Sequence, residues 1–209
     1  VKKLTGGVSQ LFSHNKVDAI HGKGKLLNQN EVEVTDLKGK KKKYNAKNII
    51  LATGSRPVNI PSVPWNGTTV VGSAGALEFT ETPKKLGIIG AGVIGLELGS
   101  VWSRLGSEVE IFEAEKELLP MLDSDMTRSI EREFKKQNLN IHLGCYVKES
   151  KKYRKGVNLE IEIDGKIEKK YFDKVIVAVG RRPFTENLLD ESCGLELDKK
   201  GFISVNEYC

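Results

Sequence analysis

The first 57 residues alternate between apolar and polar positions in a way that predicts one helix and several short strands. Residues 2–15 form an amphipathic helical pattern with four apolar positions on one face: Leu4, Val8, Leu11 and Phe12. Strands are predicted next, with turn residues between them, over 17–21, 24–27, 31–35 and a stretch that ends near residue 44. A continuous apolar run over 48–52 predicts a buried strand, and the Pro-, Gly- and Asn-rich residues 58–75 read as a connector.

The remaining pattern alternates strands with helices. A strand over 85–89 runs into an apolar helix that ends at a glycine C-cap, Gly106, and a strand over 107–112 follows. Asp123 is a candidate N-cap for a helix to about residue 137, with Met126, Ile130 and Phe134 expected to face inward. The later segments predict a strand over 140–147, a hairpin over 157–171 around Asp-Gly at 164–165, and a buried strand over 173–179. This order predicts an α/β fold with a parallel sheet, flanking helices and a β-hairpin layer.

Three glycines after the strand over 85–89 form a G-x-G-x-x-G motif. Gly90 allows the tight turn off the strand, Gly92 leaves room for a pyrophosphate against the backbone, and Gly95 lets the helix pack close to the sheet. The helix N-terminus presents N–H groups and a positive dipole end to phosphates. Because a strand precedes the motif and a helix follows it, the sequence predicts a dinucleotide site in a Rossmann-like fold.

Glu113 lies directly after the second strand of this βαβ unit, 18 residues beyond Gly95. Such folds place there the carboxylate that accepts hydrogen bonds from the adenine ribose, and a carboxylate repels the 2′-phosphate of NADP. The alternative is an exposed acid at a strand end. The position favours the ribose role, and therefore NAD.

The motif A-x-G-x-R-P occurs twice, at 52–57 and at 178–183, each time after an apolar strand. Glycine allows close backbone approach at the strand end, and proline stiffens the exit. The repeat is either a coincidence between two turns or a sign of two related nucleotide-binding domains. In the second case the glycine motif of the first domain would precede residue 1, so we expect the chain to be part of a larger polypeptide.

Several longer stretches resemble one family along essentially the whole chain: LTGG at 4–7, ILATGS at 50–55, SAGAL at 73–77, GAGVIGLELGSVW at 90–102 and VGRRP at 179–183. The chain resembles the dihydrolipoamide dehydrogenases, which are pyridine nucleotide–disulfide oxidoreductases. The resemblance implies an enzyme that oxidises dihydrolipoyl groups of 2-oxoacid dehydrogenase complexes or of the glycine cleavage system. Electrons would pass through a redox disulfide to FAD and then to NAD, in a homodimer.

The resemblance also implies a domain organisation. Residues 1–57 correspond to the end of the first FAD-domain segment, 58–187 to the NAD-binding domain, and 188–209 to the start of the returning FAD or central segment. The paired redox cysteines, the FAD domain's own glycine loop and the acid–base histidine of the family are absent from the 209 residues. We therefore expect the parent protein to be the enzyme and the chain alone to be inactive.

The resemblance adds cofactor positions to those of the glycine motif. Ile94 and Glu97 are expected near the nicotinamide, although Glu97 equally suits a helix-dipole role. Val147 is expected near the adenine or as a plain core residue, and Gly180 near NAD. The residues expected to bind NAD are Gly90, Ala91, Gly92, Val93, Ile94, Gly95, Leu96, Glu97, Glu113, Val147 and Gly180. The residues expected to bind FAD are Gly24, Thr53, Gly54 and Ser55.

Charge, hydropathy and cysteine content limit the classes of partner and the compartment that we expect. The net charge of +5 comes partly from lysine clusters at 40–43 and 148–155, but acids surround both, so we expect solvated hairpin edges and no nucleic-acid partner. No apolar run reaches transmembrane length, and no membrane partner is expected. Three cysteines show no metal or redox spacing, and the three histidines are scattered. The cysteines favour a reduced, intracellular setting. The residue pattern resembles bacterial members of the family more than organellar ones, so the bacterial cytoplasm is expected, with the mitochondrial matrix as the alternative.

Two other readings stay open. The chain could come from another flavin disulfide reductase or an NADH oxidase, but an NADPH-using member would carry a basic residue near Glu113, and residues 113–115 are acidic. A non-catalytic NAD-binding module is the rival from a different class, and it would be supported if the complete reading frame lacked the cysteine pair.

Overall fold

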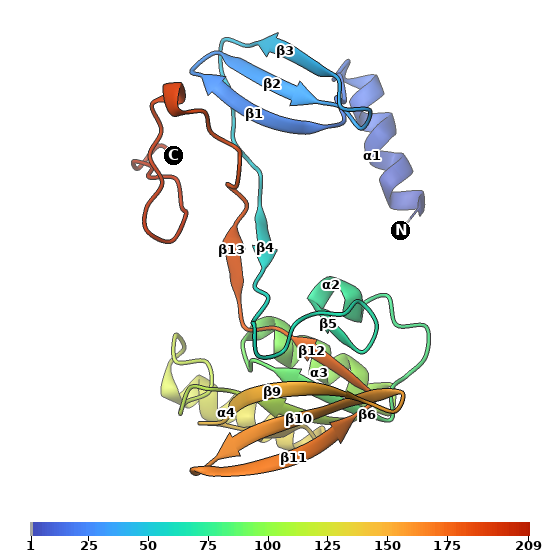
Figure 1. Cartoon of the computed structure of the whole chain (residues 1–209). Coiled ribbons are helices and arrows are strands. Elements are labelled where there is room, and N and C mark those ends of the chain that lie inside the picture. Colours follow the sequence, from blue (N-terminus) through green and yellow to red (C-terminus); the bar gives the residue numbers. More distant parts are fainter. Residues whose placement is uncertain (1) are drawn as a thin grey trace. The chain divides into compact units, whose positions relative to one another are not determined.

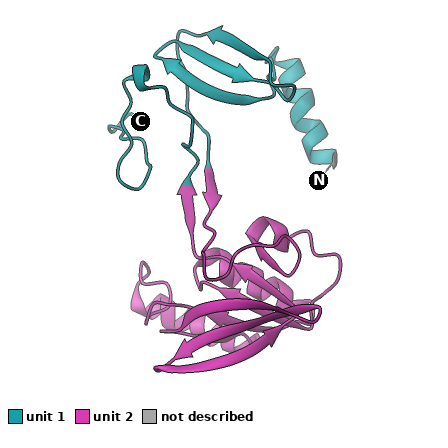
Figure 2. Ribbon diagram, in the orientation of Figure 1, with its two compact units in different colours: residues 1–54, 183–209 teal, residues 55–182 magenta. Residues whose placement is uncertain are grey.

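The computed structural model describes residues 2–209, which form two compact units (Figure 2). Unit 1 comprises residues 1–54 and 183–209, and unit 2 comprises residues 55–182. The expected assignment of FAD and NAD domains, with boundaries at 57/58 and 187/188, stays a prediction about function. No helix in the described range is long and apolar enough to cross a lipid bilayer.

A five-stranded parallel sheet forms the centre of unit 2 (Figure 1). Its strands, in spatial order, are β5 (Val70–Gly72), β12 (Lys174–Val177), β6 (Lys85–Ile89), β7 (Glu108–Phe112) and β8 (Asn140–His142). Ile89 at the end of β6 lies opposite Phe112 of β7 and Val177 of β12. The carboxyl ends of the three central strands therefore meet at one edge of the sheet, where ligands bind in open α/β folds.

Helices cover one face of this sheet. They are α2 (Ser73–Ala76), α3 (Val93–Arg104) and α4 (Ser124–Lys136). One apolar cluster joins Leu96 and Trp102 of α3 to Leu86, Ile88 and Ile111 of the sheet. The fully buried aliphatic strands supply the packing that holds the glycine-rich start of α3 at the edge of the sheet.

Helix α4 begins as predicted. Asp123 accepts a hydrogen bond from the N–H of Asp125 at 2.9 Å, and Ile130 and Phe134 pack against the core. Met126 was expected to face inward, but it is 57% exposed. Since Met126 lies in the first turn of α4, beyond the edge of the cluster, that part of the prediction is wrong.

An antiparallel sheet covers the opposite face of the parallel sheet. It contains β9 (Tyr146–Tyr153), β10 (Gly156–Ile163) and β11 (Lys166–Phe172), with β10 in the centre. Val157, Leu159 and Ile161 of β10 pack in a second cluster with residues of the parallel sheet, among them Ile89 and Phe112. Adjacent residues of one strand point to opposite faces, so Ile111 in the first cluster and Phe112 in the second place the parallel sheet between two layers.

The predicted hairpin is confirmed. Asp164 and Gly165 have φ of 49° and 75°, as a two-residue type I′ turn requires. The predicted strand over 140–147 is instead two strands, because Gly144 with φ of 65° turns the chain between β8 and β9.

Unit 1 contains α1 (Lys2–His14) and an antiparallel sheet of β1 (Lys23–Asn28), β2 (Glu31–Thr35) and β3 (Lys41–Asn45). The returning chain lies beside β1 just before η1 (Glu191–Cys193). The N–H of Leu26 donates a hydrogen bond to the carbonyl of Leu188 at 2.7 Å. The N–H of Asp190 donates one to the carbonyl of Leu26 at 2.9 Å.

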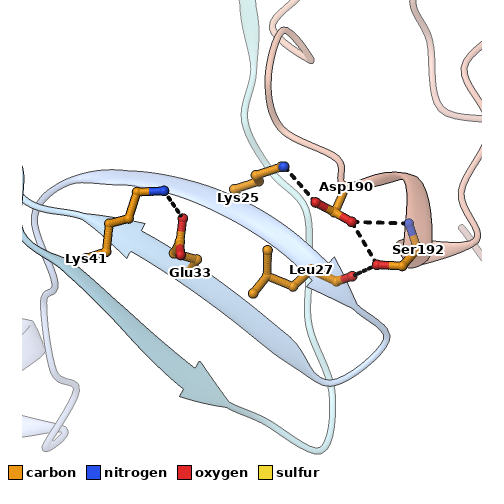
Figure 3. Close-up of polar contacts among 6 residues, drawn as sticks. All are labelled: Lys25, Leu27, Glu33, Lys41, Asp190 and Ser192. Carbon is orange, nitrogen blue, oxygen red and sulfur yellow. Dashed lines mark hydrogen bonds and ion pairs between the residues drawn. The ribbon is translucent and has the colours of Figure 1, made fainter.

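Side chains secure the same junction in unit 1 (Figure 3). Lys25 pairs with Asp190 at 2.7 Å, and the Ser192 hydroxyl donates to the Leu27 carbonyl at 2.8 Å. The hydrogen bond from Lys25, followed by those from Ser192, lowers the pKa of Asp190 to about 2. Between the neighbouring strands β2 and β3, Lys41 pairs with Glu33 at 2.8 Å (Figure 3).

Two predicted strands are not formed. Residues 17–21 and 48–52 have no regular structure, and Ile50 is 91% exposed. A buried parallel strand needs partners for its N–H and C=O groups, and no strand of the described part of the chain pairs with 48–52. High β-propensity alone therefore does not make a strand here.

The two A-x-G-x-R-P segments lie side by side. Strand β4 (Ser55–Pro57) pairs with β13 (Arg181–Pro183). The guanidinium of Arg181 donates to the hydroxyl and the carbonyl of Ser55 at 2.8 and 2.6 Å. Gly54 and Gly180 both have positive φ, 71° and 131°, which explains a glycine at the same place in both copies.

Candidate functional site

The turn between β6 and α3 depends on its first and third glycines. Gly90 has φ of 101°, and a Cβ atom there would lie 2.6 Å from the carbonyl oxygen of Ala178. A Cβ atom on Gly95 would lie 2.0 Å from the carbonyl oxygen of Gly90. Both contacts are impossible for a larger residue without movement of the backbone, so these glycines let α3 start directly above the end of β6.

Gly92 differs from its two neighbours in the motif. It is the N-cap of α3, no side chain caps the helix there, and a Cβ atom at this position would meet nothing within 4 Å. The space that a side chain would fill is open, and it lies at the positive end of a twelve-residue helix. This arrangement fits a diphosphate lying against the backbone.

The carboxylate of Glu113 is held at the same edge of the sheet. One oxygen accepts a hydrogen bond from the N–H of Ala91 at 2.7 Å, and the other accepts one from the N–H of Glu115 at 3.0 Å. The backbone of Glu113 is fixed as well, because its N–H donates to His142 and its carbonyl accepts from Cys145. Glu113 is half-buried, so the oriented carboxylate stays accessible.

A cleft of about 560 Å³ connects these features at the carboxyl edge of the sheet. Seven of the residues expected to bind NAD line it: Gly90, Gly92, Val93, Ile94, Glu113, Val147 and Gly180. The structure thus brings together residues that are up to 90 positions apart, from the glycine turn to the exit of β12.

Four other expected residues do not line the cleft. Ala91, Gly95 and Leu96 are buried beneath it, where they support the turn and the helix, and Glu97 is exposed on α3. The positions expected to bind FAD lie elsewhere: Gly24 in β1, Thr53 and Gly54 before β4, and Ser55 in β4. Their roles stay predictions.

The sequence reasoning missed several lining residues, among them Ile60, Phe112, Cys145, Tyr146 and Val179. Phe112 and Val179 directly precede residues that were predicted, so their positions at strand ends carried a signal. Ile60 lies in the connector, and its place in the cleft follows only from the tertiary fold.

The residues around the cleft include one cysteine, Cys145. Burial raises the pKa of the Cys145 thiol, which keeps it protonated near neutral pH. The cleft combines an open space at the start of α3, the oriented carboxylate of Glu113 and apolar walls. Together these features suit an elongated ligand with a diphosphate and a hydroxylated sugar.

Comparisons with known proteins agree with this geometry. The family model described as "Pyridine nucleotide-disulphide oxidoreductase" matches residues 1–209. The chain is 41% identical over 206 residues to dihydrolipoyl dehydrogenase 3 of Pseudomonas putida, covering 98% of this chain and 44% of that protein. It is 41% identical over 210 residues to the mitochondrial dihydrolipoyl dehydrogenase of Sus scrofa, covering 99% of this chain and 41% of that protein.

Two solved structures have a similar fold. LpdA from Mycobacterium tuberculosis superposes with a TM-score of 0.87 at 20% identity, covering 98% of this chain and 45% of that chain, and supports the fold alone. The HOCl-induced flavoprotein disulfide reductase RclA from Escherichia coli superposes with a TM-score of 0.82 at 27% identity, covering 98% of this chain and 47% of that chain. The chain spans less than half the length of the curated relatives it matches. With the α/β fold, the glycine turn and a family match along its whole length, the chain belongs to the pyridine nucleotide-disulphide oxidoreductase family.

Proposed function

We propose that unit 2 binds NAD in the cleft at the carboxyl edge of its parallel sheet. The observation that carries this proposal is the Glu113 carboxylate, which two backbone N–H groups orient beside the glycine turn. A carboxylate in this place accepts hydrogen bonds from the two ribose hydroxyls and repels a 2′-phosphate. The ligand is therefore NAD rather than NADP.

The residues of the cleft fit the parts of NAD in order. Gly92 and the first turn of α3 would hold the diphosphate, Glu113 the adenine ribose, and Val147 the adenine. Ile94 and Gly180 would lie toward the nicotinamide, with Glu97 nearby on α3. Bound NAD would supply a hydride acceptor, while the chain's own groups bind and orient it.

We propose further that the chain is part of an NAD-dependent dihydrolipoyl dehydrogenase. The dihydrolipoyl dehydrogenases that match nearly its whole length at 41% identity support this assignment. The complete enzyme would hold FAD, partly through Gly24, Thr53, Gly54 and Ser55, and would act as a homodimer. Its partners would be the lipoyl groups of 2-oxoacid dehydrogenase complexes or of the glycine cleavage system.

Titration calorimetry on the 209-residue chain tests the binding proposal. We expect NAD to bind and NADP to bind at least about tenfold more weakly, since the 2′-phosphate would meet the Glu113 carboxylate. Equal affinities, or a preference for NADP, would contradict the proposal.

A second assay tests the enzyme proposal on the complete protein. We expect it to oxidise dihydrolipoamide with NAD and to show a flavin absorption spectrum. A complete protein that reduces a different disulfide with NADPH would instead support another flavin disulfide reductase. A complete protein without redox cysteines would support a non-catalytic NAD-binding module.

A further inference from the structure

Three charged or polar side chains meet between the two sheets of unit 2, close to the cleft but outside it. The carboxylate of Glu110, on β7, accepts hydrogen bonds from Nε2 of His142 at 3.0 Å and from Nζ of Lys170 at 2.6 Å. The three side chains are 19%, 30% and 26% exposed in that order. Because they come from β7, β8 and β11, the cluster ties the parallel sheet to the hairpin layer.

The cluster holds the aromatic ring of Phe112, which is buried behind the cleft. The ring of Phe112 stacks on that of His142, with centroids 5.1 Å apart and planes at 10°. The ammonium group of Lys170 lies 5.8 Å from the centre of the same ring, within cation–π range. Phe112 is among the residues around the cleft but is only 1% exposed, so two members of the cluster fix the position of a buried ring directly behind the cleft surface.

The backbone continues the connection to Glu113. The carbonyl of His142 accepts a hydrogen bond from the N–H of Glu113 at 2.9 Å. The carbonyl of Glu113 accepts one from the N–H of Cys145 at 2.8 Å. A shift of His142 would therefore move both the acid proposed to bind ribose and the segment that leads to Val147. In the proposed NAD complex these groups would surround the adenosine half of the ligand, and Gly180 and Ile94 would lie toward its nicotinamide.

We propose that Glu110 is a positioning residue for the groups that would surround the adenosine half of the ligand, acting through His142, Lys170 and Phe112. The inference rests on the proposed NAD binding and extends it to a residue that touches no part of the ligand. The competing explanation is a cluster that only joins the two layers. In that case its removal lowers stability but leaves the geometry around Glu113 unchanged.

The variant Glu110→Gln tests this, since it keeps the size of the side chain and removes its charge. Glu108→Gln is the matched control, because Glu108 lies on the same strand, is 60% exposed and pairs only distantly with Lys85 at 3.9 Å. Lys170→Met is a second test variant, which keeps the aliphatic stem and removes the ammonium group. Thermal midpoints identify the variants that are folded at the assay temperature.

Two measurements are made on the 209-residue chain. Calorimetry with ADP-ribose measures affinity for the adenosine half, and amide NMR spectra of the unliganded chain follow the N–H groups of Ala91 and Glu113. We expect Glu110→Gln and Lys170→Met to weaken ADP-ribose binding by about three- to tenfold, the size typical of residues coupled through one hydrogen-bond network. We expect the two amide resonances to shift in these variants and to stay in place in Glu108→Gln.

The outcomes separate the two proposals. Failure of the unaltered chain to bind ADP-ribose or NAD would overturn the proposed function, and the unliganded amide spectra would still report on the positioning of Glu113. An ADP-ribose affinity in folded Glu110→Gln and Lys170→Met equal to that of Glu108→Gln, with unmoved amides, would overturn the positioning role.

Discussion

Replacing Glu113 by alanine is the most informative single change in the cleft. Its carboxylate accepts hydrogen bonds from two backbone N–H groups. In the proposed complex it also accepts hydrogen bonds from the ribose hydroxyls. A hydrogen bond to a charged group contributes about 1.5–3 kcal/mol, and Glu113 is half-buried, so water replaces it only in part. Loss of one such bond to the ligand corresponds to an NAD affinity about ten- to a hundredfold lower.

The same change should narrow the discrimination against NADP, because the charge that repels the 2′-phosphate is gone. Calorimetry with both dinucleotides measures the two effects on the 209-residue chain. Glu117→Gln is the control, since it removes a nearby exposed charge that does not line the cleft.

Stability must be followed in parallel, because alanine leaves the N–H groups of Ala91 and Glu115 without their carboxylate. Both tryptophans of the chain, Trp65 and Trp102, lie in unit 2, whereas Tyr44 and Tyr208 lie in unit 1. Fluorescence excited where tryptophan absorbs and tyrosine does not therefore reports the unfolding of unit 2. If folded Glu113→Ala binds NAD within about twofold of the unaltered chain, the ribose role of Glu113 is wrong.

Three further predictions concern the framework of unit 2. Gly90→Ala places a Cβ atom 2.6 Å from the carbonyl oxygen of Ala178 at a φ of 101°, so we expect a loss of about 1–3 kcal/mol in urea unfolding followed by fluorescence; an unchanged midpoint would contradict it. Asp123→Ala removes the N-cap of α4 and should cost about 1 kcal/mol in the same assay, with Asp123→Asn as the variant that retains stability. The hydrogen bond from His142, followed by that from Lys170, lowers the pKa of Glu110 from 4.5 to about 2. Its ionised form therefore stabilises the fold above about pH 4.5 and this contribution is lost as the pH falls toward about 2, so Glu110→Gln should flatten the acid side of the stability profile; parallel profiles would refute this.

Local patterns were enough to predict several structural features around the cleft, while the binding roles of these residues stay predictions. The glycine motif, Glu113, the N-cap Asp123 and the turn at Asp164 each depend on residues close together in the sequence. Each of these features needs a particular type of residue at one position. A glycine allows a positive φ or an open helix start, an aspartate caps a helix, and a glutamate places a carboxylate at a strand end. The structure places Glu113 beside the glycine turn through its bond with Ala91, 22 residues away.

Other features depend on partners that local patterns do not reveal. The runs over 17–21 and 48–52 have the composition of strands but no paired neighbour among the described residues, and they stay irregular. Glu110 and Lys170 are 60 residues apart, and their contact depends on how the hairpin layer packs on the parallel sheet. Ile60 reaches the cleft for the same kind of reason, from a connector with no regular pattern.

A crystal structure of the chain soaked with NAD tests the central claim most directly. The account predicts the adenine ribose hydroxyls within about 2.6–3.2 Å of the Glu113 carboxylate and the diphosphate at the start of α3 beside Gly92. NAD bound away from this edge of the sheet, or with its nicotinamide ribose at Glu113, would contradict it.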